Sequence, residues 1–312
     1  MKKIVLVFSI FLFSNLNYAK ANEFIQFKYF DPKLKKEIQI AAQIYFPKKK
    51  QGKLPVIIAM HGSTRDTMKF KNGGKSNEFA KRVMKRGVKE GYAVVVPDLF
   101  YKQKDVGKNK TQFPNAKVPI MQLKKMLMED KRFDRNNFFF TGFSWGGETG
   151  LGFLNNSYKN VPRPYWKAIA SAEPGCNRVP EPIKYDFPIL IVKGEKSHYP
   201  PKPCIYYKDL INKKGNNASV EVISAANHFY STDLKETKGV AINACSDNIA
   251  IKKIDGSWIR ANGDPSTGKL KECWGSRVVS GKNYKKLNEA IDIIFKFFII
   301  LPDSSISSIN SS

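Results

Sequence analysis

Histidine and cysteine are scarce in this chain: its 312 residues contain three histidines and four cysteines. No two cysteines have the Cys-x-x-Cys spacing that structural zinc sites commonly use. With so few side chains that bind transition metals, we expect no metal and no cofactor. The scarcity also makes any histidine that follows a predicted strand informative.

The chain also lacks an apolar run long enough to span a bilayer, which takes about 20 residues. Ile4–Phe13 is too short, and Ile291–Leu301 is interrupted by two charged residues. Ile4–Phe13 follows two lysines and is followed by a polar stretch that ends in Ala19–Ala21, the layout of a secretory signal peptide. We therefore expect residues 1–21 to be removed after Ala21 and the protein to be exported, either periplasmic or secreted; a retained membrane anchor is the weaker alternative.

A basic block interleaved with aromatic residues is missing as well, although the net charge is +26. The positive charge comes mostly from lysine and is spread along the whole chain, which is typical of compositional drift. Such a field can attract anionic surfaces or substrates, but we expect no nucleic-acid partner. There are no internal repeats and no linker, so the length predicts one large domain.

The four cysteines, Cys176, Cys204, Cys245 and Cys273, are expected to form two disulfides in an exported protein. Three pairings are possible. We favour Cys176 with Cys204 and Cys245 with Cys273, each closing a loop that contributes about 3–4 kcal/mol through chain entropy.

Short apolar runs alternate with helical patterns along most of the chain, which predicts an α/β fold with a mostly parallel, doubly wound sheet and helices on both faces. An antiparallel pair is expected to open the sheet. The expected strands are 24–30, 37–46, 54–60, 92–97, 138–141, 166–172, 188–192 and 218–223, and the expected helices are 77–90, 118–130, 205–213 and 283–301. In the second helix, Ile120, Leu123 and Met126 are expected on the buried face.

Residues 231–282 interrupt this pattern with a polar stretch that contains Cys245 and Cys273. The stretch is too long for a bare loop, so we expect a disulfide-pinned subdomain beside the functional site. The domain is expected to cover residues 22–303, and the serine-rich residues 304–312 to be a disordered tail.

The most informative motif is Gly142-Phe-Ser144-Trp-Gly146, which follows four β-forming residues and precedes a glycine-rich segment able to start a helix. A sharp strand–serine–helix turn needs small residues on both sides of the serine, because a Cβ there would collide with neighbouring elements. The motif predicts a nucleophilic Ser144. The alternative is an ordinary glycine turn.

A serine hydroxyl becomes a good nucleophile only when a base takes its proton. His228 follows the last predicted strand and is the expected base, whereas His61 is expected to be structural. The turn after strand 54–60 places the Ser63 amide as one oxyanion donor, and the amide of Trp145, the residue after the nucleophile, is expected to be the second.

Two charged residues lie near this predicted site. Arg65 is a candidate for binding an anionic group of the substrate, with a solvated surface arginine as the alternative. Asp98 ends a strand at the carboxyl edge of the sheet, where it is expected to cap or brace a loop.

Several segments together resemble the dienelactone hydrolase family of α/β-hydrolases. They are Gly142–Gly146, Val95–Leu99, Pro174–Cys176, the Gly194-Glu-Lys loop and Pro203-Cys204. The resemblance covers about residues 54–228 and the last helix, and it implies an α/β-hydrolase fold with the chain order nucleophile, acid, histidine. The family proper uses cysteine as nucleophile, so Ser144 implies an esterase-like relative rather than a true dienelactone hydrolase.

The acid of the triad is where the chain departs most from this family. The family usually has aspartate where this chain has Ser197, which cannot stabilise an imidazolium as a carboxylate does. Glu173 is favoured as a replacement, because it ends the preceding strand as the acid of pancreatic-type lipases does. Glu195 and the absence of any acid are the alternatives.

These features predict an exported serine hydrolase that cleaves a carboxylic ester, or a related acyl bond, of a small molecule. The rival hypothesis is a catalytically impaired binding protein on the same scaffold, motivated by Ser197. The sequence does not indicate the substrate or the oligomeric state.

Overall fold

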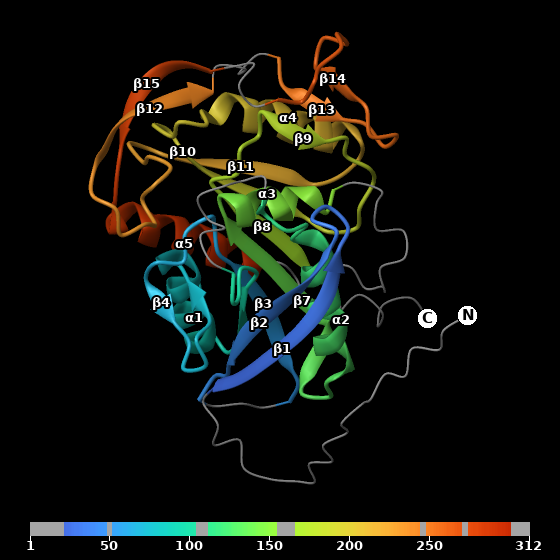
Figure 1. Ribbon diagram of the computed structural model, residues 1–312, viewed down its shortest axis with the longest axis vertical. Coiled ribbons are helices and arrows are strands. Elements are labelled where there is room, and N and C mark those ends of the chain that lie inside the picture. The colour runs from blue at the N-terminus through green and yellow to red at the C-terminus, as the bar shows by residue number, and fades with distance from the viewer. Residues whose placement is uncertain are drawn as a thin grey trace.

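The computed structural model describes residues 22–48, 52–103, 112–154, 166–243, 248–269 and 274–300 (Figure 1). The predicted signal peptide, Cys245, Cys273 and the predicted tail lie outside these ranges. Within them, no helix is long and apolar enough to cross a membrane.

An eight-stranded sheet forms the centre of the fold, in the order β1-β2-β6-β3-β7-β8-β10-β11. β1 and β2 pair antiparallel, β2 runs antiparallel to β6, and the remaining pairs are parallel. The strands are β1 (Asn22–Asp31), β2 (Lys36–Tyr45), β3 (Leu54–Met60), β6 (Ala93–Asp98), β7 (Phe133–Phe143), β8 (Ala168–Ala172), β10 (Ile189–Gly194) and β11 (Ala218–Ile223). The expected mostly parallel α/β sheet is confirmed.

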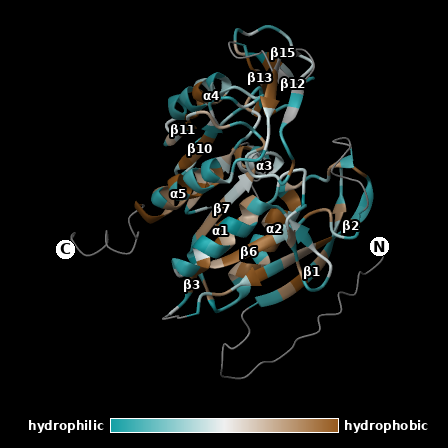
Figure 2. Cartoon of the chain, turned by 90° about the vertical axis from the view of Figure 1, so that its left-hand side faces the viewer, coloured by the Kyte–Doolittle hydropathy of each residue, from teal (hydrophilic) through white to brown (hydrophobic). Residues whose placement is uncertain are grey.

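Helices cover both faces of this sheet (Figure 1). On one face α1 (Glu78–Lys89) and α5 (Tyr284–Ile300) share a core with alternate strand residues such as Ile57 and Val94. On the other face α2 (Lys117–Glu129), α3 (Trp145–Gly152) and α4 (Pro201–Lys213) pack on the residues between them. Figure 2 shows hydrophobic residues along the central strands and hydrophilic residues on the outer surface of α1. Burial on both faces explains why the central strands are continuously apolar.

The insertion at residues 231–282 contains β12 (Thr237–Asn243), β13 (Ala250–Lys252), β14 (Trp258–Arg260) and β15 (Trp274–Ser280). β12 pairs with β15, and β13 pairs with both β14 and β9 (Arg178–Pro180). β9 begins just after Cys176, so the insertion is attached to the segment that leaves β8. Two further short strands, β4 (Met68–Lys69) and β5 (Lys75–Ser76), form a separate pair.

One expected core residue is wrong. Met126 is 38% exposed, whereas Lys124, Leu127 and Met128 are buried on α2. The buried face of α2 therefore continues from Ile120 and Leu123 to Leu127 and not to Met126. The ammonium group of Lys124 lies over the rings of Trp166 and Phe138, and burial lowers the pKa of Lys124 to about 7.

Candidate active site

Ser144 lies in the sharp turn between β7 and α3, with a φ of 54°. Such a positive φ is uncommon for a residue with a side chain and stores strain. Both motif glycines are needed for close packing. A Cβ on Gly142 would lie 2.4 Å from the backbone of Gly146, and one on Gly146 would lie 2.8 Å from the carbonyl oxygen of His61.

His228 lies in the loop after β11, and its Nε2 atom is 3.0 Å from Ser144 Oγ. This is hydrogen-bonding distance. The imidazole can therefore accept the hydroxyl proton of Ser144, as a general base must.

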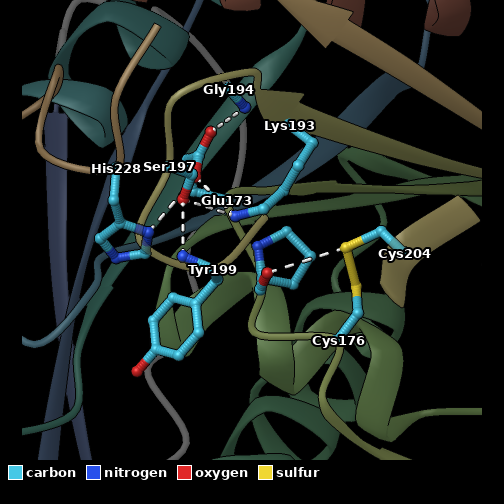
Figure 3. The surroundings of a disulfide bond; sticks show 9 residues. Glu173, Cys176, Lys193, Gly194, Ser197, Tyr199, Cys204 and His228 are labelled. Carbon is cyan, nitrogen blue, oxygen red and sulfur yellow. Dashed lines mark hydrogen bonds and ion pairs between the residues drawn. A yellow bond between two sulfur atoms is a disulfide. The ribbon is translucent and has the colours of Figure 1, made fainter. Parts of the chain in front are cut away.

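Glu173 reaches His228 from the end of β8 (Figure 3). Its Oε2 atom is 3.3 Å from His228 Nδ1, and its Oε1 atom accepts a hydrogen bond from the Gly194 amide. The carboxylate is fully buried, and its backbone has a φ of 52°. Glu195, the alternative acid, is exposed and instead binds the Ser224 hydroxyl and the Ala225 amide.

A buried lysine, which the sequence reasoning missed, completes this group. Lys193 Nζ lies 2.7 Å from Glu173 Oε2 and 3.0 Å from Ser197 Oγ. Burial alone would raise the pKa of Glu173, but Lys193 and His228 lower it to about 2. Burial lowers the pKa of Lys193, and Glu173 opposes that change. The 2.7 Å separation is typical of a charge-assisted hydrogen bond, so we describe the two as an ion pair.

The segment His61–Ser63 runs beside the nucleophile. A Cβ on Gly62 would lie 3.3 Å from Ser144 Cβ. The next residue along the chain is Ser63, so its amide lies beside the nucleophile. Among the residues that the structure describes, neither the Ser63 amide nor the Trp145 amide has a hydrogen-bond acceptor. Two backbone donors are thus available next to Ser144.

His61 lies behind this segment and is fully buried. Its Nε2 atom accepts a hydrogen bond from the Leu99 amide, and its Nδ1 atom is in hydrogen-bonding contact with the Gly62 carbonyl oxygen. These partners select a neutral ring that carries its proton on Nδ1. Burial lowers the pKa of His61 to about 4. This arrangement supports the structural role expected for His61.

Arg65 donates to Asp98 Oδ1 at 2.5 Å, and its guanidinium lies 5.2 Å from the centre of the Phe100 ring. Asp98 also accepts hydrogen bonds from the Lys75 and Phe100 amides, which is the loop-bracing role expected of it. Since the guanidinium already has a carboxylate partner, binding of an anionic substrate group by Arg65 stays a prediction.

Aromatic rings surround the two reactive side chains. Trp145 stacks on Phe100 at 4.8 Å and also contacts Phe113. On the other side, the His228 ring contacts Tyr199 at 5.3 Å and His198 at 4.5 Å. The rings of Tyr199 and His198 thus limit the rotation of the imidazole.

The disulfide predicted between Cys176 and Cys204 is confirmed (Figure 3). It joins the turn that follows Glu173 to α4, whose start follows the loop of Ser197 and Tyr199. The two segments that surround the carboxylate are therefore covalently connected. Among the described residues, no three His, Cys, Asp or Glu side chains come together as metal ligands.

Residues 42–162, from β2 past α3, match BD-FAE, a family of the α/β-hydrolase type. The observed strand order and the turn at Ser144 are those expected of an α/β-hydrolase fold. The described part of the chain has the α/β-hydrolase fold. The matched segment includes Ser144, while Glu173 and His228 lie beyond it.

No curated protein matches this sequence. Solved structures similar to it include a protein assigned as a dienelactone hydrolase from Klebsiella pneumoniae subsp. pneumoniae, with 16% identity and a TM-score of 0.46, covering 66% of this chain and 88% of the other. Another is Thermogutta terrifontis esterase 2 phosphoramylated by tabun, with 14% identity and a TM-score of 0.49, covering 68% and 88%.

Proposed function

We propose that the protein is a serine hydrolase that cleaves a carboxylic ester through an acyl-enzyme on Ser144. One observation carries this proposal: the continuous series from Ser144 Oγ through His228 to Glu173, with separations of 3.0 and 3.3 Å. Each contact matches a step that ester hydrolysis by a serine needs.

In the first half of the reaction, His228 Nε2 takes the hydroxyl proton while Ser144 Oγ bonds to the carbonyl carbon. The carbonyl oxygen becomes an oxyanion, which the amides of Ser63 and Trp145 stabilise. The C–O bond to the alcohol then breaks, and the imidazolium gives its proton to the leaving oxygen.

In the second half, His228 takes a proton from water, and the hydroxide formed attacks the acyl carbon. The bond to Ser144 Oγ breaks, the serine regains its proton, and the carboxylic acid leaves. Glu173 accepts a hydrogen bond from the imidazole Nδ1–H throughout, stays ionised and balances the charge of the imidazolium. Glu173 beside His228 favours this function over a non-catalytic binding protein, because Ser197 no longer leaves the histidine without an acid.

We also propose that the enzyme is exported. The arrangement of residues 1–21 and the disulfide between Cys176 and Cys204 support this proposal, since disulfides persist in oxidising compartments. The N-terminal sequence of protein recovered from the culture medium or periplasm tests it: a chain beginning at Asn22 is expected, and a cytoplasmic chain that keeps Met1 would contradict it.

A fluorophosphonate probe tests the enzymatic function, because it reacts with activated serines. The wild type is expected to be labelled once, Ser144→Ala not at all, and the control Ser224→Ala, which removes an exposed serine, as the wild type is. A wild-type protein that stays unlabelled and does not hydrolyse p-nitrophenyl acetate would refute the proposal.

A further inference from the structure

We propose that Lys193 is a positioning residue of the triad, whose ammonium group shares the Glu173 carboxylate with His228 and thereby keeps His228 active as a base to lower pH. This inference rests on the proposed function and deepens it.

The position of Lys193 is dictated by the sheet. β8 and β10 run parallel with Ala172 opposite Val192, so the next residues, Glu173 and Lys193, are neighbours across the two strands. The Glu173 amide donates to the Val192 carbonyl oxygen, which continues the ladder past the end of β8. Both side chains are 0% exposed. A charged lysine is rarely buried without a specific partner.

The ammonium group is surrounded by groups that favour its charge. Nζ binds Glu173 Oε2 at 2.7 Å and Ser197 Oγ at 3.0 Å, and it lies 5.8 Å from the centre of the Tyr199 ring. Ser197 Oγ also accepts a hydrogen bond from the Tyr199 amide. Ser197 is therefore a neutral acceptor for the lysine at the position where relatives are expected to carry aspartate.

The lysine changes the charge of the buried group. In a triad with one carboxylate and one histidine, the imidazolium formed during the reaction is neutralised by the carboxylate alone. Here Oε2 of Glu173 already has a full cation at 2.7 Å, closer than the 3.3 Å to His228 Nδ1. Protonation of His228 therefore gives the group of three a net positive charge, which a buried site disfavours.

The size of this effect follows from geometry. Because Lys193 Nζ and His228 Nδ1 both contact Oε2, at 2.7 and 3.3 Å, they are at most about 6 Å apart. At that separation and an effective dielectric constant of about 20, two unit positive charges repel enough to shift a protonation midpoint by about two pH units.

Several other groups pack around His228 in the described part of the chain. His198, Tyr199 and Phe229 contact its ring from neighbouring loops, and the fully buried Tyr230 follows it along the chain. Burial raises the pKa of Tyr230 well above its usual value, so its hydroxyl stays neutral. Glu148 on α3 acts on Lys193 only through a longer-range attraction. Glu173 and Lys193 form the ion pair that acts on His228, and His198 is a second titratable group beside its ring.

The test is the pH dependence of kcat/KM for p-nitrophenyl acetate hydrolysis. The acid limb of this profile reports loss of the base in the free enzyme. Lys193→Met is expected to move the midpoint of this limb up by about two pH units, because it removes a positive charge near His228. Ser197→Asp keeps the lysine but adds a negative charge beside it, so it is expected to move the midpoint in the same direction.

Two matched controls separate charge from packing. Ser197→Asn changes the size of the side chain without adding charge, and it is expected to leave the midpoint in place. Lys124→Met removes the other fully buried lysine of the described chain, which lies on α2 against Trp166 and Phe138, and is also expected to leave the midpoint in place. A purely structural role for Lys193 would lower the rate without separating Ser197→Asp from Ser197→Asn.

Unchanged midpoints in Lys193→Met and Ser197→Asp would overturn the inference. If Lys193→Met does not fold, the difference between Ser197→Asp and Ser197→Asn decides alone. Fluorophosphonate labelling distinguishes this failure from failure of the proposed function: labelling of wild-type Ser144 with unchanged midpoints refutes only the role of Lys193, and a wild type without label refutes the hydrolase itself.

Discussion

Replacing Glu173 with glutamine keeps the shape of the side chain and removes its charge. Oε1 accepts a hydrogen bond from the Gly194 amide, so the carbonyl oxygen of the glutamine is expected to take that place. Its NH2 group then faces Lys193 Nζ and His228 Nδ1, which are both donors in the wild type. His228 consequently loses its acceptor, and its ring shifts to the tautomer with the proton on Nε2, which cannot accept the proton of Ser144.

The expected loss in activity is large. Removing the charge of the triad acid while keeping its shape costs about 10⁴-fold in turnover in a serine protease. We expect kcat/KM for p-nitrophenyl acetate to fall by about 10³ to 10⁴ in Glu173→Gln. Stability is expected to fall as well, by about 3–5 kcal/mol in urea unfolding, because Lys193 is left buried without a counter-charge.

Glu195→Gln is the matched control, since it makes the same change in the other candidate acid. Glu195 is exposed and does not contact His228, so activity within about threefold of wild type and a change in stability within about 0.5 kcal/mol are expected. Near-normal turnover in Glu173→Gln, or a larger loss in Glu195→Gln than in Glu173→Gln, would refute the assignment of the acid.

Three further changes have outcomes that follow from the structure. Burial holds the pKa of His61 at about 4, against an ordinary value of 6.5, so the unfolded chain binds a proton before the folded chain does as pH falls. Through this residue, the wild type is expected to lose about 3 kcal/mol of unfolding free energy between pH 6.5 and pH 4. Urea unfolding of His61→Asn should show a correspondingly smaller loss over the same range. The Cys176→Ala/Cys204→Ala double variant removes a cross-link between residues 28 apart and is expected to unfold with about 3–4 kcal/mol less free energy in urea; equal stability would show that the cross-link contributes nothing. Gly146→Ala would place a Cβ 2.8 Å from the His61 carbonyl oxygen, so it is expected to abolish fluorophosphonate labelling or folding, and a fully active variant would contradict the tight turn at Ser144.

The central strands were predictable because both faces of the sheet are covered. Leu54–Met60 and Ala218–Ile223 have the expected bounds in the structure. A strand buried on both sides must be apolar throughout, and this signal is local in the sequence. The turn at Ser144 was equally visible, since the Gly-x-Ser-x-Gly pattern is local in the sequence, although the contact that requires Gly146 is with the distant His61.

The insertion was much less predictable. β13 and β14 are three residues each, and the pairing of β12 with β15 contains register shifts. Short, irregular strands do not show the alternation that identifies a strand in a sequence. Pairing of β13 with β9 also joins segments far apart in the chain, which no local pattern reveals.

Lys193 was missed for a related reason. At the end of an apolar strand a lysine usually reaches solvent, and its partner Glu173 lies 20 residues earlier. The missing signal was the register of two parallel strands, which places the two residues side by side. An apolar strand that ends in lysine and glycine, next to one that ends in glutamate, would have indicated the pair.

The most direct test of the proposed acyl-enzyme is intact-protein and peptide mass spectrometry after rapid acid quenching of a reaction with p-nitrophenyl acetate. A mass increase of one acetyl group, located on the peptide that contains Ser144 and lost in Ser144→Ala, is predicted. Turnover of the ester with no acetylated protein at any time, or with the acetyl group on another residue, would contradict it.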